Sequence, residues 1–363
     1  MKIIKCTLIA TAILIIASCA NNSLDIDINL ENFVPSEDEG LAKINVRDSA
    51  EWIVVDSIRL IDGKGKLSFS PKGPTSFYLS ISGIPEAIAG FGYQGKLSLT
   101  GDASVFPFQG ELSGTESQDN LNEYMSKRDE FKNFTDGLRE TYSIASAAGD
   151  SETVDSLSAI MDLKYSQLQR ETKDFALNHD ALGAFITNRY LYMEEIEFID
   201  SVLENVTDYD SEDVNLLRKR SEALHRVAIG ETYSDISQFD TSGVAISLSS
   251  LISKYTLVDF WASWCGPCRA QNPDLVDMYR RWSNKFEIVG VAFDQDNDRW
   301  KKAIIDDGLT WPQMSDLKGW GNSAAELYSI RAIPQNILID PAGIIVARNI
   351  EIPELENFLT ELD

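Results

Sequence analysis

The pattern of hydrophobic and polar positions changes its period along the chain. Between residues 30 and 115, apolar positions alternate with polar ones, as in the stretch SFYLSI at 76–81. Asp62 and Gly63 lie between two such runs, at 52–61 and 66–70, and this pair is typical of a hairpin turn. Several short strands at this spacing predict a small antiparallel β-sandwich over residues 30–115.

Residues 116–229 have a helical period instead. Apolar side chains recur three and four positions apart in three stripes, at 121–142, 154–168 and 196–206, with acidic residues between them. We predict four or five helices, with breaks at Asp150 and at 208–210. Such stripes are typical of packed cores rather than cofactor sites. His179 and His225 lie too far apart in the sequence to predict a shared site.

Residues 230–363 alternate between strand and helix patterns. This arrangement predicts an α/β sheet with mixed strand directions. The expected strands are 257–261, 286–293, 336–339 and 344–348, and the expected helices are 265–282, 299–307, 323–328 and one at the C-terminus.

The first residues have the features of an export signal. Lys2 and Lys5 precede an apolar run at 8–17 that is too short for a membrane span, as in a secretory signal peptide over residues 1–18. The tetrapeptide IASC at 16–19 resembles a bacterial lipobox, which implies cleavage before Cys19 and acylation of that cysteine. In enteric-type sorting, an aspartate directly after the acylated cysteine keeps a lipoprotein in the inner membrane. Ala20 occupies that position here, which favours the outer membrane. Residues 19–29 are then expected to form a tether.

Composition narrows the functional classes. At 363 residues the chain is long enough for two or three domains, and 44% hydrophobic residues is typical of packed globular protein. The net charge of −25 is spread along the whole chain, so it predicts a solvated surface. It also disfavours a nucleic-acid partner, because such a partner would be held by a basic patch.

Only two of the four cysteines are free for chemistry. Cys6 lies in the signal and Cys19 is the lipid acceptor, which leaves Cys265 and Cys268 in one C-x-x-C motif. A closed zinc site needs about four ligands, but residues 230–363 contain no further cysteine and no histidine. Redox chemistry needs only two thiols, the first at a helix start where a thiolate is favoured. We therefore expect no metal and no cofactor beyond a redox-active Cys265–Cys268 disulfide.

The residues around these cysteines resemble a known active site. The run FWASWCGPC at 260–268 is similar to that of thioredoxin, Asp259 lies at the position of its buried acid, and Ile333-Pro334 resembles its cis-proline loop. The longer pattern over 230–363 resembles the exported reductases of the TlpA and ResA type. Residues 30–115 resemble a domain of unknown function that precedes thioredoxin domains in exported lipoproteins.

The resemblance and the chemistry together imply roles for individual residues. Cys265 attacks, Cys268 resolves the mixed disulfide, and Asp259 is the candidate general base. The expected substrate-binding residues are Trp264, Gly266, Pro267, Ile333 and Pro334.

Two positions depart from the pattern. Gln271 stands where the TlpA and ResA type usually has an acid, and the strand 286–293 lacks the lysine that thioredoxin pairs with its buried acid.

The expected function is that of a lipid-anchored thiol-disulfide oxidoreductase in the cell envelope, facing the periplasm. Its partners would be protein dithiol or disulfide substrates and an upstream envelope thiol reductant. Residues 30–229 would position the redox domain and help to select partners. Two alternatives are a thiol peroxidase of the peroxiredoxin class and a non-catalytic envelope scaffold.

Overall fold

The computed structural model describes residues 23–35, 40–48, 51–207 and 210–362. The predicted signal peptide and Cys19 lie outside these residues. The chain divides into two compact units, residues 1–122 and residues 123–363, and each is described by itself.

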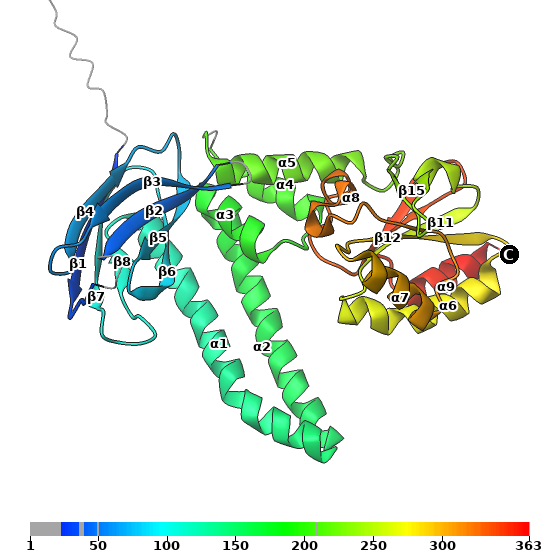
Figure 1. The fold of residues 1–363 in the computed structure, drawn as a ribbon, viewed down its shortest axis with the longest axis horizontal. Helices are drawn as coiled ribbons and strands as arrows, with labels where there is room; N and C mark the ends of the chain where they lie inside the picture. The colour runs from blue at the N-terminus through cyan, green and yellow to red at the C-terminus, as the bar shows by residue number, and fades with distance from the viewer. Residues whose placement is uncertain (1–22, 36–39, 49–50, 208–209, 363) are drawn as a thin grey trace, which may run out of the picture. The chain divides into compact units, whose positions relative to one another are not determined.

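The first unit contains two four-stranded sheets (Figure 1). One has the order β4-β1-β7-β8 and the other β3-β2-β5-β6. Alternate side chains from both sheets enter one buried cluster, as the period-2 pattern predicts. The strands are β1 (Leu24–Glu31), β2 (Leu41–Asp48), β3 (Glu51–Arg59), β4 (Lys64–Phe69), β5 (Thr75–Ile81), β6 (Ile84–Gly92), β7 (Gly95–Asp102) and β8 (Glu111–Ser113).

The predicted tether over residues 19–29 is wrong for its described part. Residues 24–29 belong to β1, which lies inside its sheet between β4 and β7. Leu24, Ile26 and Ile28 are buried while the residues between them are polar, so this segment follows the strand period. The pairing of β1 with β7 is parallel, so the sandwich is not antiparallel throughout. Strands β2–β6 intervene between these two neighbours and allow the parallel crossover.

The turn predicted at Asp62 and Gly63 is present. Both residues have positive φ, at 49° and 74°, as a type I′ turn requires. Ile61 and Lys64 form an isolated bridge across the turn, and β3 and β4 belong to different sheets.

Helices follow, as the sequence predicts. Asp150 caps α2 by accepting a hydrogen bond from the Thr153 N–H, which explains the helix break at this position. Residues 208–209 of the second predicted break lie outside the described residues. The helices are α1 (Glu116–Ala148), α2 (Ser151–Asn178), α3 (Asp180–Tyr190), α4 (Ile196–Glu204) and α5 (Glu212–Arg226).

The C-terminal part has the predicted thioredoxin-like fold. A mixed sheet has the order β13-β12-β11-β14-β15, in which β12 is parallel to β11 and β14 is antiparallel to it. Helix α6 packs against β12, α7 and α9. The elements are β11 (Tyr255–Trp261), α6 (Gly266–Trp282), β12 (Phe286–Ala292), α7 (Asn297–Asp307), α8 (Ser323–Leu327), β14 (Gln335–Ile339), β15 (Ile345–Arg348) and α9 (Ile352–Glu361).

Three short strands in this part were not predicted. They are β9 (Ser237–Phe239), β10 (Ala245–Ser247) and β13 (Gln313–Met314), each of two or three residues and therefore too short to show a period.

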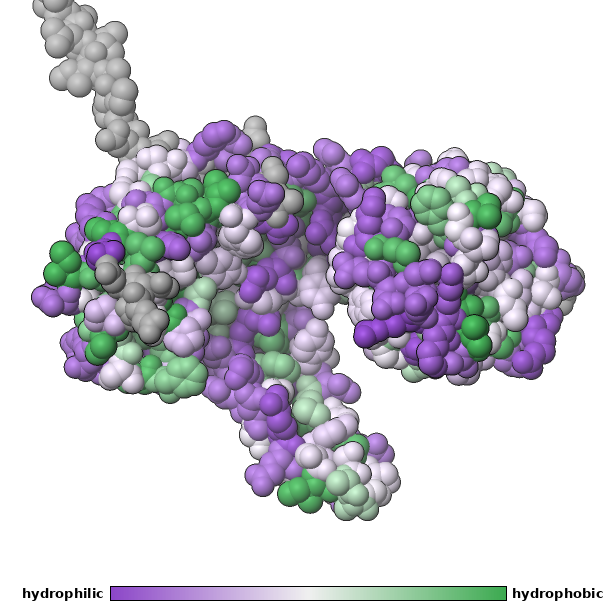
Figure 2. Space-filling model, in the orientation of Figure 1, coloured by the Kyte–Doolittle hydropathy of each residue, from purple (hydrophilic) through white to green (hydrophobic). Residues whose placement is uncertain are grey.

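Hydrophilic residues cover much of the face shown in Figure 2, in keeping with the high net charge. Among the described helices, none is long and apolar enough to cross a membrane.

Candidate active site

The two cysteines of the C-x-x-C motif form a disulfide at the start of α6. Cys265 is the N-cap of the helix, and its Sγ accepts a hydrogen bond of 3.2 Å from the Cys268 N–H. Pro267 lies in the first turn, where its missing N–H costs no helical hydrogen bond. In the reduced protein, the same N–H and the helix dipole would stabilise a thiolate at Cys265.

Hydrogen bonds from neighbouring elements hold the loop before Cys265. Asp294 follows β12 and accepts from both the N–H and the Oγ of Ser263. Arg269, one turn into α6, donates to the Ser263 carbonyl and pairs with Asp307 at the end of α7. The loop is therefore fixed from both sides, which orients Cys265.

Asp259 lies on β11, the central strand of the sheet, between Gly290 of β12 and Asn336 of β14. Its side chain is 7% exposed, and burial raises the pKa of its carboxyl group to about 7. A carboxyl group with this pKa exchanges a proton readily near neutral pH, which is the property a general base needs.

Pro334 and Asp259 line the same groove, of about 440 Å³. The Ile333–Pro334 peptide bond is cis, as the resemblance implies. Gln271 also lines this groove and is exposed. The three positions singled out from the sequence on α6, β11 and the cis-proline loop therefore meet at one surface.

A second groove, of about 400 Å³, is lined by Trp264, Phe293 and Trp320 together with charged and polar residues. The indoles of Trp264 and Trp320 are 53% and 50% exposed, with ring centroids 6.1 Å apart. The Trp264 Nε1 donates to the Phe293 carbonyl, which fixes this ring one residue before Cys265. The half-exposed indoles give the surface beside the disulfide an apolar part.

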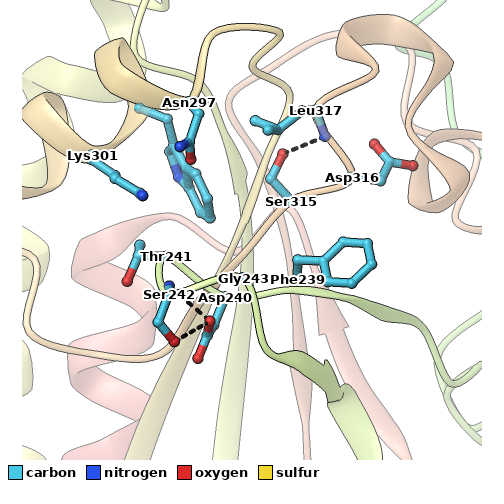
Figure 3. Close-up of a pocket in the computed structure, with 11 residues that line it drawn as sticks. Phe239, Asp240, Thr241, Ser242, Gly243, Asn297, Lys301, Ser315, Asp316 and Leu317 are labelled. Atoms are coloured by element: carbon cyan, nitrogen blue, oxygen red, sulfur yellow. Dashed lines mark hydrogen bonds between the residues drawn. The ribbon is translucent and has the colours of Figure 1, made fainter.

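A third pocket lies where the turn after β9 approaches α7 (Figure 3). Asp240 holds the turn by accepting hydrogen bonds from Ser242 and Val244. Lys301 of α7 and Leu317 also line the pocket. None of the predicted site residues is among those that line it, neither the two cysteines nor Trp264, Asp259 and Pro334, so we do not assign it to the redox site.

Among the residues that the structure describes, no group of three or more His, Cys, Asp and Glu side chains could hold a metal ion. His179 stacks on Phe175, whereas His225 lies 2.9 Å from Asp200. The two histidines therefore have separate structural partners.

Comparison with known proteins shows which protein family the segment around this site resembles. Residues 229–348 match the AhpC/TSA family. This segment is thus an AhpC/TSA thioredoxin-like domain, and its homologues include proteins named as thiol-disulfide oxidoreductases.

Two curated relatives illustrate the likeness. The thiol-disulfide oxidoreductase ResA of Oceanobacillus iheyensis is 32% identical over 121 residues, which are 32% of this chain and 62% of the relative. The thioredoxin-like protein YneN of Bacillus subtilis is 28% identical over 134 residues, covering 36% of this chain and 76% of that protein.

Solved structures also match this domain. A thiol-disulfide oxidoreductase from Bacteroides fragilis is 33% identical, with a TM-score of 0.35, and the match covers 37% of this chain and 100% of that one. The thioredoxin domain of a thiol-disulfide oxidoreductase from Bacteroides vulgatus is 35% identical, with a TM-score of 0.35 and coverage of 37% and 97%.

Sequence reasoning missed the residues that hold the active-site loop. Asp294 and Asp307 contact Ser263 and Arg269 from 31 and 38 residues away. One signal was available for Asp294, since it follows a strand parallel to β11 and the ends of parallel strands meet at one edge. No local signal marks Asp307.

Proposed function

We propose that this protein is a thiol-disulfide oxidoreductase that reduces protein disulfides through Cys265 and Cys268. The observation that carries the proposal is the Cys265–Cys268 disulfide at the N-terminus of α6, with Cys265 as the cap. The named oxidoreductases among the relatives support the same activity. The Gly266-Pro267 dipeptide between the cysteines favours a reductant or isomerase-like donor.

The reaction begins from the reduced dithiol. The Cys265 thiolate attacks one sulfur of a substrate disulfide, so a mixed disulfide forms and the other substrate sulfur leaves as a thiolate, which takes up a proton. Cys268 then attacks Cys265 and releases the second substrate sulfur. Two electrons pass to the substrate, and an upstream envelope thiol must restore the dithiol.

Asp259 supplies the proton acceptor in the second step. Cys268 must lose its proton before it attacks, and the carboxyl group of Asp259, with a pKa of about 7, is ionised in about half of the molecules at neutral pH. Gln271 cannot take this role because an amide does not titrate.

The substrate would be an extended polypeptide segment. The Ile333 backbone beside Pro334 would pair with it by strand-like hydrogen bonds, and the exposed Trp264 indole would cover its apolar part. Gly266 adds no side chain at the helix start, which leaves room for the approaching sulfur.

A trapping experiment tests this order of attack. We expect Cys268→Ser to accumulate mixed disulfides with substrate proteins, because Cys265 can still attack once but nothing resolves the product. Cys265→Ser should trap nothing and should abolish reduction. Full turnover by Cys268→Ser would show that the order is wrong.

We also propose that the protein is lipid-anchored at Cys19 and faces the periplasm, most simply from the outer membrane. The lipobox-like tetrapeptide and Ala20 support this location. Mass spectrometry of the mature N-terminus tests it, and an unmodified N-terminus at another residue would contradict it.

The thiol peroxidase is the second candidate, and the match to the AhpC/TSA family favours keeping it. A peroxidase of this class attacks with one peroxidatic cysteine, whereas here the first cysteine is paired three residues away. Peroxide consumption with the same reductant separates the two activities. We expect no more than the rate of a Cys265→Ser control.

A further inference from the structure

One wall of the groove that contains Asp259 and Pro334 comes from outside the thioredoxin-like domain. Met193, in the connection between α3 and α4, lines this groove and is 44% exposed. The helical region therefore reaches the surface where a substrate would lie.

Hydrogen bonds link this connection to the residue after Pro334. Glu195 accepts a hydrogen bond of 2.8 Å from the Asn349 side-chain amide. The Asn349 Oδ1 in turn accepts one of 3.3 Å from the Gln335 side-chain amide. Arg348, whose Nε lies 3.9 Å from Glu195, helps to hold that carboxylate in place.

The carboxylate of Glu195 determines which atom donates and which accepts in each of these hydrogen bonds. An ionised carboxylate only accepts hydrogen bonds, so Glu195 requires the NH₂ group of Asn349 to face it. The oxygen of Asn349 then faces Gln335 and requires the NH₂ group of that residue. In this series of hydrogen bonds, the Gln335 Oε1 is the acceptor that receives no hydrogen bond.

That oxygen lacks a partner. Gln335 is 7% exposed and lines the groove, and its Oε1 is buried without a hydrogen bond to any described residue. Buried acceptors are normally paired, and an unpaired one at a binding surface points to a donor supplied by a ligand.

We propose that Gln335 is a substrate-binding residue of the reductase, positioned by Glu195 through Asn349, in a groove that Met193 also lines. The ligand is an extended polypeptide segment, whose backbone N–H donates to the Gln335 Oε1 beside Pro334. The proposal rests on the proposed reductase function. It makes the helical region a determinant of substrate affinity.

The test compares steady-state reduction of insulin by the full chain and by single variants. Losing one hydrogen bond of ordinary strength corresponds to roughly a 3- to 10-fold change in an equilibrium. We therefore expect Gln335→Ala and Glu195→Ala to raise KM for insulin by about 3- to 10-fold, with kcat changed by less than about twofold. Glu195→Gln keeps an acceptor oxygen and should restore most of the parent KM.

Glu197→Ala is the matched control, because it removes an exposed acid two positions away that has no part in the chain of hydrogen bonds. It should keep the parent KM. A parent-like KM in both Glu195→Ala and Gln335→Ala, or an equal change in Glu197→Ala, would overturn the proposal. Failure of the parent to reduce either insulin or oxidised glutathione would instead refute the reductase function itself.

Discussion

Replacing Asp259 by Asn is expected to stabilise the oxidised protein, and to do so more strongly as the pH rises. Burial raises the pKa of this carboxyl group from 3.8 to about 7. Below pH 3.8 the group is protonated in both the folded and the unfolded chain, so it carries no ionisation penalty. Between pH 3.8 and 7 the unfolded chain loses the proton and the folded chain keeps it, so stability falls as the pH rises.

The size of the effect follows from the shift. A shift of about three pH units corresponds to about 4 kcal/mol once the pH has passed the folded pKa, at 1.36 kcal/mol per unit. At pH 5 only about 1.6 kcal/mol of this penalty has developed, whereas at pH 8 nearly all of it has. The stabilisation by Asp259→Asn should therefore be about 2.5 kcal/mol greater at pH 8 than at pH 5.

Denaturant unfolding of the oxidised protein measures this difference, because the Cys265–Cys268 disulfide removes the thiols from the titration. Any cost of burying the new amide is the same at both pH values and cancels. Asp274→Asn is the matched control, since Asp274 lines the same groove but is exposed. An Asp259→Asn variant that gains no more stability at pH 8 than at pH 5 would refute the assigned burial.

Two further predictions concern the scaffold of the site. Asp294→Ala should lower the free energy of unfolding by about 1–3 kcal/mol, because it removes the acceptor of two hydrogen bonds from buried surroundings, and a denaturant melt unchanged from the parent would contradict this. The fragment 230–363 should still reduce oxidised glutathione, since both cysteines, Asp259 and Pro334 lie within it; a fragment that folds but is inactive would place part of the catalytic machinery upstream.

The sequence by itself determined the features that depend on near neighbours. Cys265 caps its helix and Pro267 occupies the first turn because the motif and the helix start are within four residues of each other. Asp150 separates two helices for the same reason, and Asp62-Gly63 makes its turn because both residues tolerate positive φ.

The tertiary structure decided what depends on distant pairing. Segment 24–29 has the strand period, but it falls in the short polar stretch that we expected to form a tether, and only its placement between β4 and β7 shows why its apolar side chains are buried. The parallel partner of β1 is about 70 residues away, beyond the reach of any local pattern.

The same division holds within the candidate site. The disulfide, Asp259 and the cis-proline were expected from short motifs, whereas Glu195 reaches Asn349 across 154 positions of sequence. A single side-chain contact of this kind leaves no period and no spacing in the chain. It exists because folding brings the connection after α3 to the end of β15. As a consequence, the helical region borders the groove, although the sequence marks no catalytic residue in it.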